Sequence, residues 1–127
     1  MREILFRGKH INLFPQNEHL NGTWVYGYLC DKNYINFPGL NGELLVDPST
    51  IGQYTGLVDK NGRRIFEGDI VKSIETKETG VVQFFPEHSA FMVWCKSSNE
   101  VGFLYECTSI AEVIGNIHDN PELLEED

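Results

Sequence analysis

Apolar positions along this chain alternate with polar ones or gather in short blocks, and these blocks predict β-strands. The blocks are rich in β-branched and aromatic residues, and Gly, Pro, Asn and Asp separate them. No long segment shows the spacing of an amphipathic helix. We therefore expect an all-β protein built from the blocks EILFRG, TWVYGYL, YINF, ELLV, RRIFEGDIV, GVVQFF, AFMVWC, GFLYEC and AEVIGNI.

The second half of the chain predicts five short strands joined by polar loops. Consecutive strands with short connections pair antiparallel, and five of them suit a small SH3-like barrel, whose closure removes exposed sheet edges. The strands are expected at residues 70–74, 80–85, 90–95, 101–107 and 112–117.

The chain divides into three parts in this interpretation. Residues 1–57 form an N-terminal β-rich segment, residues 58–119 form the barrel, and residues 120–127 form a short acidic tail. Asn120 and Pro121 suit the cap and the first position of a helix of one or two turns in that tail. No linker separates the first two parts, so we expect the N-terminal segment to pack against the barrel in one compact unit.

Asn-Gly occurs three times, at Asn21-Gly22, Asn41-Gly42 and Asn61-Gly62. This dipeptide favours type I′ turns, which need positive φ at both central residues. The sequences that flank the three pairs do not align, so we predict three turns and no internal repeat.

Glu67, Gly68 and Asp69 interrupt the block RRIFEGDIV and allow two interpretations. The two carboxylates could form an acid–base or metal site, but no third ligand or histidine stands at a supporting spacing. Alternatively, Gly68 adopts a conformation closed to other residues and Asp69 binds nearby backbone amides. We favour the second interpretation, a turn that leads into the first barrel strand.

The segment TIGQYTGLVDKNGRRIFEGDIVK, together with EVIGNIHDNPELLEE near the end, closely resembles the YopX family of phage and prophage proteins. The segments MREILFRGK and TWVYGYL fit the same family, so the resemblance covers nearly the whole chain. It implies a phage or prophage origin and a mostly β protein that contains an SH3-like barrel. It implies no enzymatic activity and gives no catalytic residue to transfer.

The charge of the chain lies at its C-terminal end. Residues 1–100 contain 10 Lys and Arg against 12 Asp and Glu, a net charge of −2, whereas residues 101–127 contain 7 acidic residues and no Lys or Arg. No basic stripe exists to neutralise phosphates, which argues against a nucleic-acid-binding protein. The acidic end could imitate the phosphates of a nucleic acid, although a solvated terminus is the favoured interpretation.

The cysteines and histidines indicate neither a disulfide framework nor a metal site. Cys30, Cys95 and Cys107 are odd in number and form no C-x-x-C motif, and no signal-like apolar run follows Met1, so we expect reduced thiols in a cytoplasmic protein. Cys95 and Cys107 are expected to be buried structural thiols rather than nucleophiles. Surface or loop positions without zinc-like spacing are expected for His10, His19, His88 and His118.

No motif marks a catalytic residue or a cofactor site. The serines stand in no nucleophile elbow, and no glycine-rich phosphate loop is present. No apolar run approaches the ~20 residues that a membrane span needs. The sequence therefore predicts no cofactor, no metal, no catalytic residue and no membrane partner.

Two aromatic groups remain. Trp24, Tyr26 and Tyr28 alternate and so share one face of a strand, and FFPEHSAFMVW gathers three Phe and one Trp near a tight loop. Single-stranded nucleic acids bind to such rows where basic residues lie between the rings, and TWVYGYL contains none. We expect both groups to pack in the core. An exposed row would instead indicate a groove for a peptide or a partner protein.

The sequence thus favours a phage accessory protein that acts without catalysis and binds another protein or itself as a homo-oligomer. Two alternatives stay open, a nucleic-acid-associated SH3-like module and an acidic inhibitor of a host nucleic-acid enzyme. A small enzyme has the least support, because no constellation of catalytic groups is visible.

Overall fold

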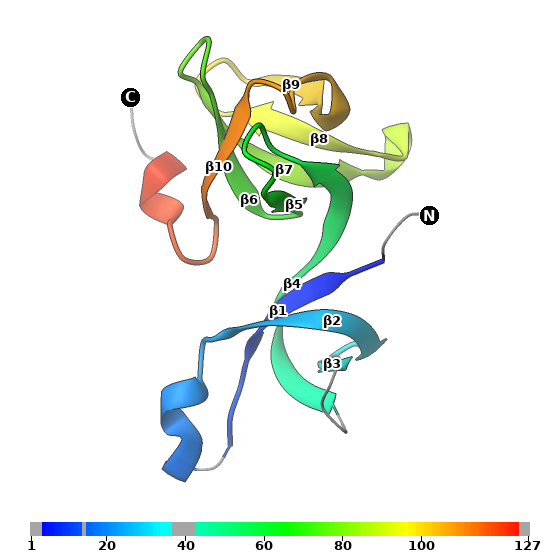
Figure 1. Cartoon of the computed structure of the whole chain (residues 1–127), viewed down its shortest axis with the longest axis vertical. Helices are drawn as coiled ribbons and strands as arrows, with labels where there is room; N and C mark the ends of the chain where they lie inside the picture. Colours follow the sequence, from blue (N-terminus) through cyan, green and yellow to red (C-terminus); the bar gives the residue numbers. More distant parts are fainter. Residues whose placement is uncertain (1–3, 14, 37–42, 125–127) are drawn as a thin grey trace. The chain divides into compact units, whose positions relative to one another are not determined.

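The computed structural model describes residues 4–13, 15–36 and 43–124, and within them the chain forms ten β-strands and four short 3-10 helices (Figure 1). The strands pair in two antiparallel sheets, so the all-β prediction is confirmed. No helix in these ranges is long and apolar enough to span a membrane. The chain divides into two compact units, Met1–Tyr54 and Thr55–Asp127.

The first unit is built from four strands that pair in a cycle. Strand β1 pairs with both β2 and β4, while β3 lies between β2 and β4. The 3-10 helix η1 (Pro15–Leu20) connects β1 to β2. The four strands are β1 (Phe6–His10), β2 (Trp24–Asp31), β3 (Tyr34–Asn36) and β4 (Glu43–Val58), the last of which continues into the second unit.

The inner face of these four strands is filled by apolar side chains. Val25, Ile35 and Val46 form the buried centre, and Phe6, Leu44 and Ile51 pack against them. β2 contributes Val25 and, two residues on, Gly27 to this face. A Cβ atom at Gly27 would lie 2.1 Å from the carbonyl oxygen of Asn36, so the close approach of β2 and β3 requires glycine.

The second unit begins with the end of β4, a tight turn and β5 (Arg64–Phe66). The backbone N–H of Gly62 donates to the Asp59 carbonyl at 3.0 Å, and that of Asp59 donates to the Arg63 carbonyl at 2.8 Å. Gly62 has φ +82, whereas Asn61 is not among the residues with positive φ. This is a three-residue connection, a type I turn followed by a left-handed glycine, so the predicted type I′ turn is wrong.

The type I′ prediction also fails at Asn21-Gly22, where only Gly22 has positive φ. The Asn41-Gly42 pair lies outside the described residues. At Asn61 the physical reason is the preceding aspartate: Asp59 accepts hydrogen bonds from the backbone N–H groups of Asn61 and Arg63, both at 2.9 Å. Such contacts from the first turn position stabilise a type I turn over its mirror image.

The main sheet of the second unit contains five antiparallel strands in the order β10-β6-β7-β8-β9. The 3-10 helix η2 (Pro86–His88) connects β7 to β8. The predicted strands at 70–74, 80–85, 90–95 and 112–117 agree with four of the five to within one residue. The strands are β6 (Asp69–Ser73), β7 (Thr79–Phe85), β8 (Ala90–Cys95), β9 (Glu100–Phe103) and β10 (Ala111–Asn116).

The strand predicted at 101–107 is wrong over its second half. β9 ends at Phe103, and η3 (Leu104–Glu106) follows. Leu104 is fully buried, and its carbonyl accepts the N–H of Cys107 at 3.0 Å. The chain turns here because the Leu104 side chain enters the core. The core cluster consists of Ile65, Val71, Val82, Phe91, Val93, Leu104, Ala111 and Val113.

The acidic tail contains the short helix η4 (Pro121–Leu124), a 3-10 helix that begins at Pro121 as predicted. The Asn120 side chain accepts the backbone N–H of Asn116 at 3.2 Å, and its carbonyl accepts that of Leu123 at 3.0 Å. The asparagine therefore joins the end of β10 to the start of η4. Residues 125–127 of the predicted tail lie outside the described residues.

Candidate functional site

The segment Glu67-Gly68-Asp69 forms the turn between β5 and β6. The Asp69 side chain is 2% exposed, and its Oδ2 accepts the backbone N–H of Phe66 at 2.7 Å. Gly68 has φ +92, donates its N–H to Val82 at 2.8 Å and accepts that of Ile117 at 2.9 Å. These contacts connect the turn to neighbouring strands. The Asp69 carboxylate can be buried because it accepts a hydrogen bond that holds the turn.

His10, His19 and His88 occupy three different elements, β1, η1 and η2. His10 is a buried residue of β1, where Nδ1 lies 2.8 Å from the Leu45 carbonyl oxygen, so its prediction as a surface or loop residue is wrong. His19 is exposed on η1, and His88 packs edge-to-face on Phe103. In the described parts of the chain, no group of three or more His, Cys, Asp or Glu could hold a metal ion.

The aromatic row of β2 faces outward. Tyr26 and Tyr28 are 40% and 59% exposed, while Val25 and Gly27, which alternate with them, are buried. The prediction that this row packs in the core is therefore wrong for both tyrosines. Alternate residues of a strand face opposite sides, and here the inner side has room for glycine and not for a ring.

Two basic residues of β1 lie beside this row. Arg7 is directly opposite Tyr26 in the strand pairing, and Lys9 is opposite Trp24. The Arg7 guanidinium carbon lies 4.6 Å from the centre of the Trp24 ring, and the Lys9 ammonium nitrogen lies 5.5 Å from it. Both distances are within the range of cation–π attraction, which orients the indole ring.

We call this surface the aromatic face: Trp24, Tyr26 and Tyr28 of β2 with Arg7 and Lys9 of β1. Its basic residues come from a different strand, so the observation that TWVYGYL contains no Lys or Arg could not reveal them. A signal was present in FRGKH, where Arg7 and Lys9 alternate with residues that face the core. Strand alternation predicts that Arg7 and Lys9 share one face of their strand, just as Trp24, Tyr26 and Tyr28 share one face of theirs.

The second aromatic group divides between core and surface. Phe91 is buried, and Phe84, directly opposite it on β7, is exposed and touches it edge-to-face with ring centres 5.2 Å apart. Trp94 donates its indole N–H to the Asn99 side chain at 3.1 Å. The core prediction is thus confirmed for Phe91 and wrong for Phe84.

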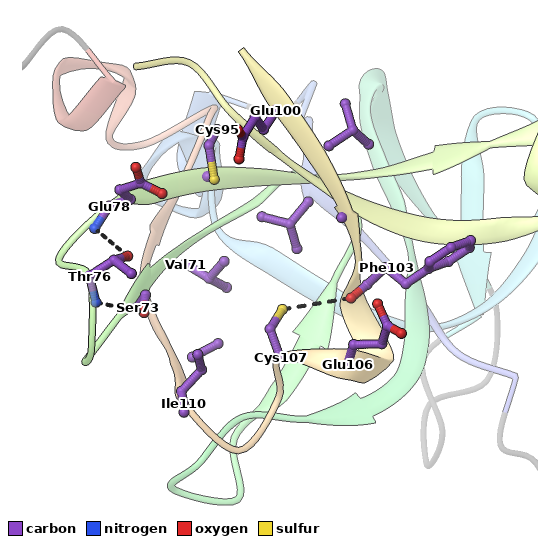
Figure 2. A pocket seen from close by; sticks show the side chains of 15 residues that line it. Val71, Ser73, Thr76, Glu78, Cys95, Glu100, Phe103, Glu106, Cys107 and Ile110 are labelled. Atoms are coloured by element: carbon purple, nitrogen blue, oxygen red, sulfur yellow. Dashed lines mark hydrogen bonds between the residues drawn. The ribbon is translucent and has the colours of Figure 1, made fainter. Parts of the chain in front are cut away.

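A cavity of about 290 Å³ opens in the second unit, between the β6–β7 loop, β8, β9 and the segment from η3 to β10 (Figure 2). Its lining is mostly apolar and includes the thiols of Cys95 and Cys107. Glu78, Glu100 and Glu106 also line it. We call it the thiol cavity. It was not evident from the sequence, because its lining residues come from several segments that are separated in the chain.

The environment of the thiol cavity disfavours thiolates. Burial raises the pKa of the Cys95 thiol above its ordinary value of 9.0, and the Glu78 and Glu100 carboxylates raise it further. Burial, followed by Cys95 and Glu106, raises the pKa of the Cys107 thiol. Cys107 also lies 3.3 Å from the Leu104 carbonyl, to which its thiol donates. Neutral thiols are poor nucleophiles, so this arrangement does not favour cysteine catalysis.

Comparison with known proteins gives one family. A family model described as YopX protein matches residues 10–125, which cover most of both structural units and include the two surfaces described above apart from Arg7 and Lys9. No curated protein matches the chain.

Proposed function

The chain belongs to the YopX protein family, and on this basis we propose that it is a phage- or prophage-encoded accessory protein that binds another protein without catalysis. The phage origin rests on the family resemblance. We place the protein in the cytoplasm of the bacterial host, because Cys30, Cys95 and Cys107 are all free thiols. Reduced thiols are typical of that compartment.

We further propose that the sheet of the second unit is a small SH3-like barrel. The strand order β10-β6-β7-β8-β9 puts the last strand beside the first, which supports a curved sheet that turns back on itself. One continuous core cluster contains residues of β6, β7, β8 and β10. This barrel provides a rigid support for loops and is compatible with many binding functions.

The aromatic face is the proposed binding surface. One observation carries this proposal: Tyr26 and Tyr28 are exposed on β2, where the alternating residues Val25 and Gly27 are buried. Trp, Tyr and Arg are the residues that contribute most often to the energetic centre of protein interfaces. Trp and Tyr line this face, and the contacts of Arg7 and Lys9 with Trp24 orient the indole ring.

The charge around this face favours a protein over a nucleic acid as partner. Residues 1–54 contain 4 Lys and Arg against 5 Asp and Glu. Arg7 is only 4% exposed, and Lys9 is directly opposite Asp47 of β4 as well as Trp24 of β2. A single strand of nucleic acid needs a positively charged path along its phosphates, and two cations held against a ring do not supply one.

The test is a pull-down with tagged protein from host lysate, before and after phage induction, with and without nuclease, and read by mass spectrometry. The bait is compared with a Tyr26→Ala/Tyr28→Ala double variant. Tyr105→Ala is the matched control, because Tyr105 is 60% exposed on η3, similar to Tyr28 on β2. We expect a stoichiometric partner that resists nuclease, disappears with the double variant and remains with Tyr105→Ala.

Three results would overturn the proposal. A partner retained by the double variant would show that the aromatic face is not the contact surface. Loss of all signal on nuclease treatment would favour the nucleic-acid-associated alternative. A basic host nucleic-acid enzyme that is lost when residues 122–127 are removed, and not with the double variant, would favour the acidic inhibitor. Light scattering of the purified protein tests the homo-oligomer, whose dissociation by the double variant would identify a second copy as the partner.

A further inference from the structure

The thiol cavity combines an apolar interior with acidic groups at its edge. Its apolar lining comes from β6, β8, β9 and the segment after η3, and consists of Val71, Val93, Val101, Phe103, Ile110 and Ala111. Glu78, Glu100 and Glu106 are exposed residues that also line it. Among its lining residues, all of which the structure describes, there is no Lys or Arg. A ligand that matches this surface has an apolar body and a positive end.

The acidic residues act on the interior of the cavity and not only on solvent. Glu78 and Glu100 both raise the pKa of the Cys95 thiol, and Glu106 raises that of Cys107. These carboxylates therefore interact electrostatically with the two thiols, and Figure 2 labels all five side chains among those that line the cavity. Near these carboxylates the thiols stay neutral and offer a polarizable apolar surface. The charged groups available to a ligand are then the carboxylates.

The β6–β7 loop is ordered by its own hydroxyl groups. The Ser73 hydroxyl oxygen accepts the backbone N–H of Glu75 and of Thr76, each at 3.2 Å. The Thr76 hydroxyl oxygen accepts the N–H of Glu78 at 3.3 Å. These bonds fix the backbone that carries the Glu78 carboxylate at the edge of the cavity. A preorganised carboxylate loses less conformational freedom when a cation binds.

Gly102 helps to keep the cavity open. It lines the cavity on β9, directly opposite the buried Val93 of β8, which lines it too. A Cβ atom at Gly102 would meet no atom within 4 Å, so the space beside this residue is empty. A larger side chain at position 102 would enter that space without displacing the backbone.

We propose that the thiol cavity binds an organic cation with an aliphatic stem, an alkylammonium group. The stem lies against the valines, Phe103 and the two thiols, and the ammonium lies toward the carboxylates at the edge of the cavity. The cavity volume of about 290 Å³ accommodates a chain of a few methylene groups. The source is either a free alkylamine or the side chain of a lysine on another protein. All lining residues belong to the unit Thr55–Asp127, so this proposal does not rest on the aromatic face.

The experiment is a titration of the full chain followed by backbone amide NMR, with hexylammonium as probe and with hexanol and hexanoate as neutral and negative comparators. We expect saturable shifts at Gly80, Gly102 and Ile110 with hexylammonium. Hexanol is expected to bind about tenfold more weakly, because exposed carboxylates each contribute a modest attraction to the cation. Added salt should weaken the binding of hexylammonium and leave that of hexanol unchanged.

Two variants separate the charge from the cavity. Glu78→Gln/Glu100→Gln/Glu106→Gln should reduce hexylammonium affinity to that of hexanol, because it removes the carboxylates and keeps the apolar lining. Gly102→Leu should abolish binding of both probes by filling the empty space. The far-ultraviolet circular dichroism and melting temperature of each variant show whether it has folded. The glutamine variant carries the test if the leucine variant fails to fold.

Equal affinity for hexanol and hexylammonium would overturn the proposal, and so would binding of hexylammonium that survives the triple substitution. The absence of saturable shifts with every probe would also overturn it. Cadaverine and N-acetyl-lysine-N-methylamide then distinguish the two sources. Tighter binding of the free diamine assigns a small-molecule ligand, and tighter binding of the capped lysine assigns a basic side chain of a protein.

Discussion

The Oδ2 atom of Asp59 accepts the backbone N–H of Val113 at 2.9 Å, although 54 residues separate the two in the chain. Oδ1 of the same carboxylate accepts the N–H groups of Asn61 and Arg63, both at 2.9 Å. Asp59 is 5% exposed. One buried carboxylate therefore stabilises the β4–β5 turn and joins it to β10.

The first prediction concerns the pH dependence of stability. Burial alone would raise the pKa of Asp59, but the N–H donors of Val113, Arg63 and Asn61, with the Arg63 guanidinium, hold the pKa below its ordinary value of 3.8. The folded-state pKa is below the unfolded one, so this group stabilises the fold above the ordinary value and loses that contribution as the pH falls through the folded value. We expect Asp59→Asn to lower the free energy of unfolding near neutral pH by about 1–3 kcal/mol.

Urea unfolding of both proteins between neutral pH and about pH 3 measures this effect. The difference between wild type and Asp59→Asn should begin to shrink at the acidic end, because the carboxylate takes up its proton in the unfolded state before it does so in the folded state, where its pKa is lowered. Glu87→Gln is the matched control, since Glu87 is exposed on η2. A constant difference across the pH range would contradict the prediction.

The second prediction concerns Gly27. Its substitution by alanine would put a Cβ atom 2.1 Å from the Asn36 carbonyl oxygen, which belongs to the backbone and cannot rotate away. Separation of β2 from β3 should cost about 1–3 kcal/mol, as for other overpacked interiors. The control is Gly102→Ala, whose Cβ would have no neighbour within 4 Å. Denaturant unfolding of the two variants checks the ranking, and equal losses of stability would refute it.

These residues show how far the sequence could predict the fold. The strand at Ala90–Cys95 follows directly from a run of β-branched and aromatic residues between polar loops. The turn at Gly68 follows from a glycine beside an aspartate. Local pattern does not tell which face of a strand is buried when both faces carry apolar residues. In TWVYGYL both Val25 and Tyr26 are apolar enough to face the core. In the structure the buried face is the one with Val25 and Gly27, where the Asn36 carbonyl leaves no room for a side chain at position 27.

The candidate sites were harder to predict than the strands. The aromatic face depends on the pairing of β1 with β2, which brings Arg7 to Tyr26 across a connection that contains η1. The thiol cavity depends on the turn at Leu104, where a buried side chain ends a segment that reads as a continuous strand. Both sites arise from contacts between segments far apart in the chain, and spacing within one segment does not show which segments pair.

The third prediction separates the two faces of the first unit. Ile35 is fully buried, whereas Tyr28 is 59% exposed. We expect Ile35→Ala to lower the free energy of unfolding by about 2–5 kcal/mol, because it leaves a cavity in a small core. Tyr28→Ala should change stability by less than about 0.5 kcal/mol, as is usual for an exposed side chain. A loss of stability in Tyr28→Ala comparable with that of Ile35→Ala would show that the ring packs inside.

The fourth prediction concerns the reactivity of the three thiols. Cys30 is exposed, whereas Cys95 and Cys107 are half-buried and burial raises the pKa of each of these two above 9.0. Alkylation requires the thiolate and access to it. Iodoacetamide near neutral pH should therefore modify Cys30 first, and mass spectrometry of the peptides measures the three rates.

Raising the pH should accelerate alkylation of Cys95 and Cys107, because their thiolate fractions are still far from saturation. A triple Glu78→Gln/Glu100→Gln/Glu106→Gln variant should also react faster at these two sites, since it removes the carboxylates that disfavour their thiolates. Its Cys30 rate provides the internal control, because Cys30 is not among the residues that line the thiol cavity. If Cys95 or Cys107 reacted before Cys30 in the wild-type chain, the cavity would hold an activated thiol, and the assignment of its sulfurs as neutral lining would fail.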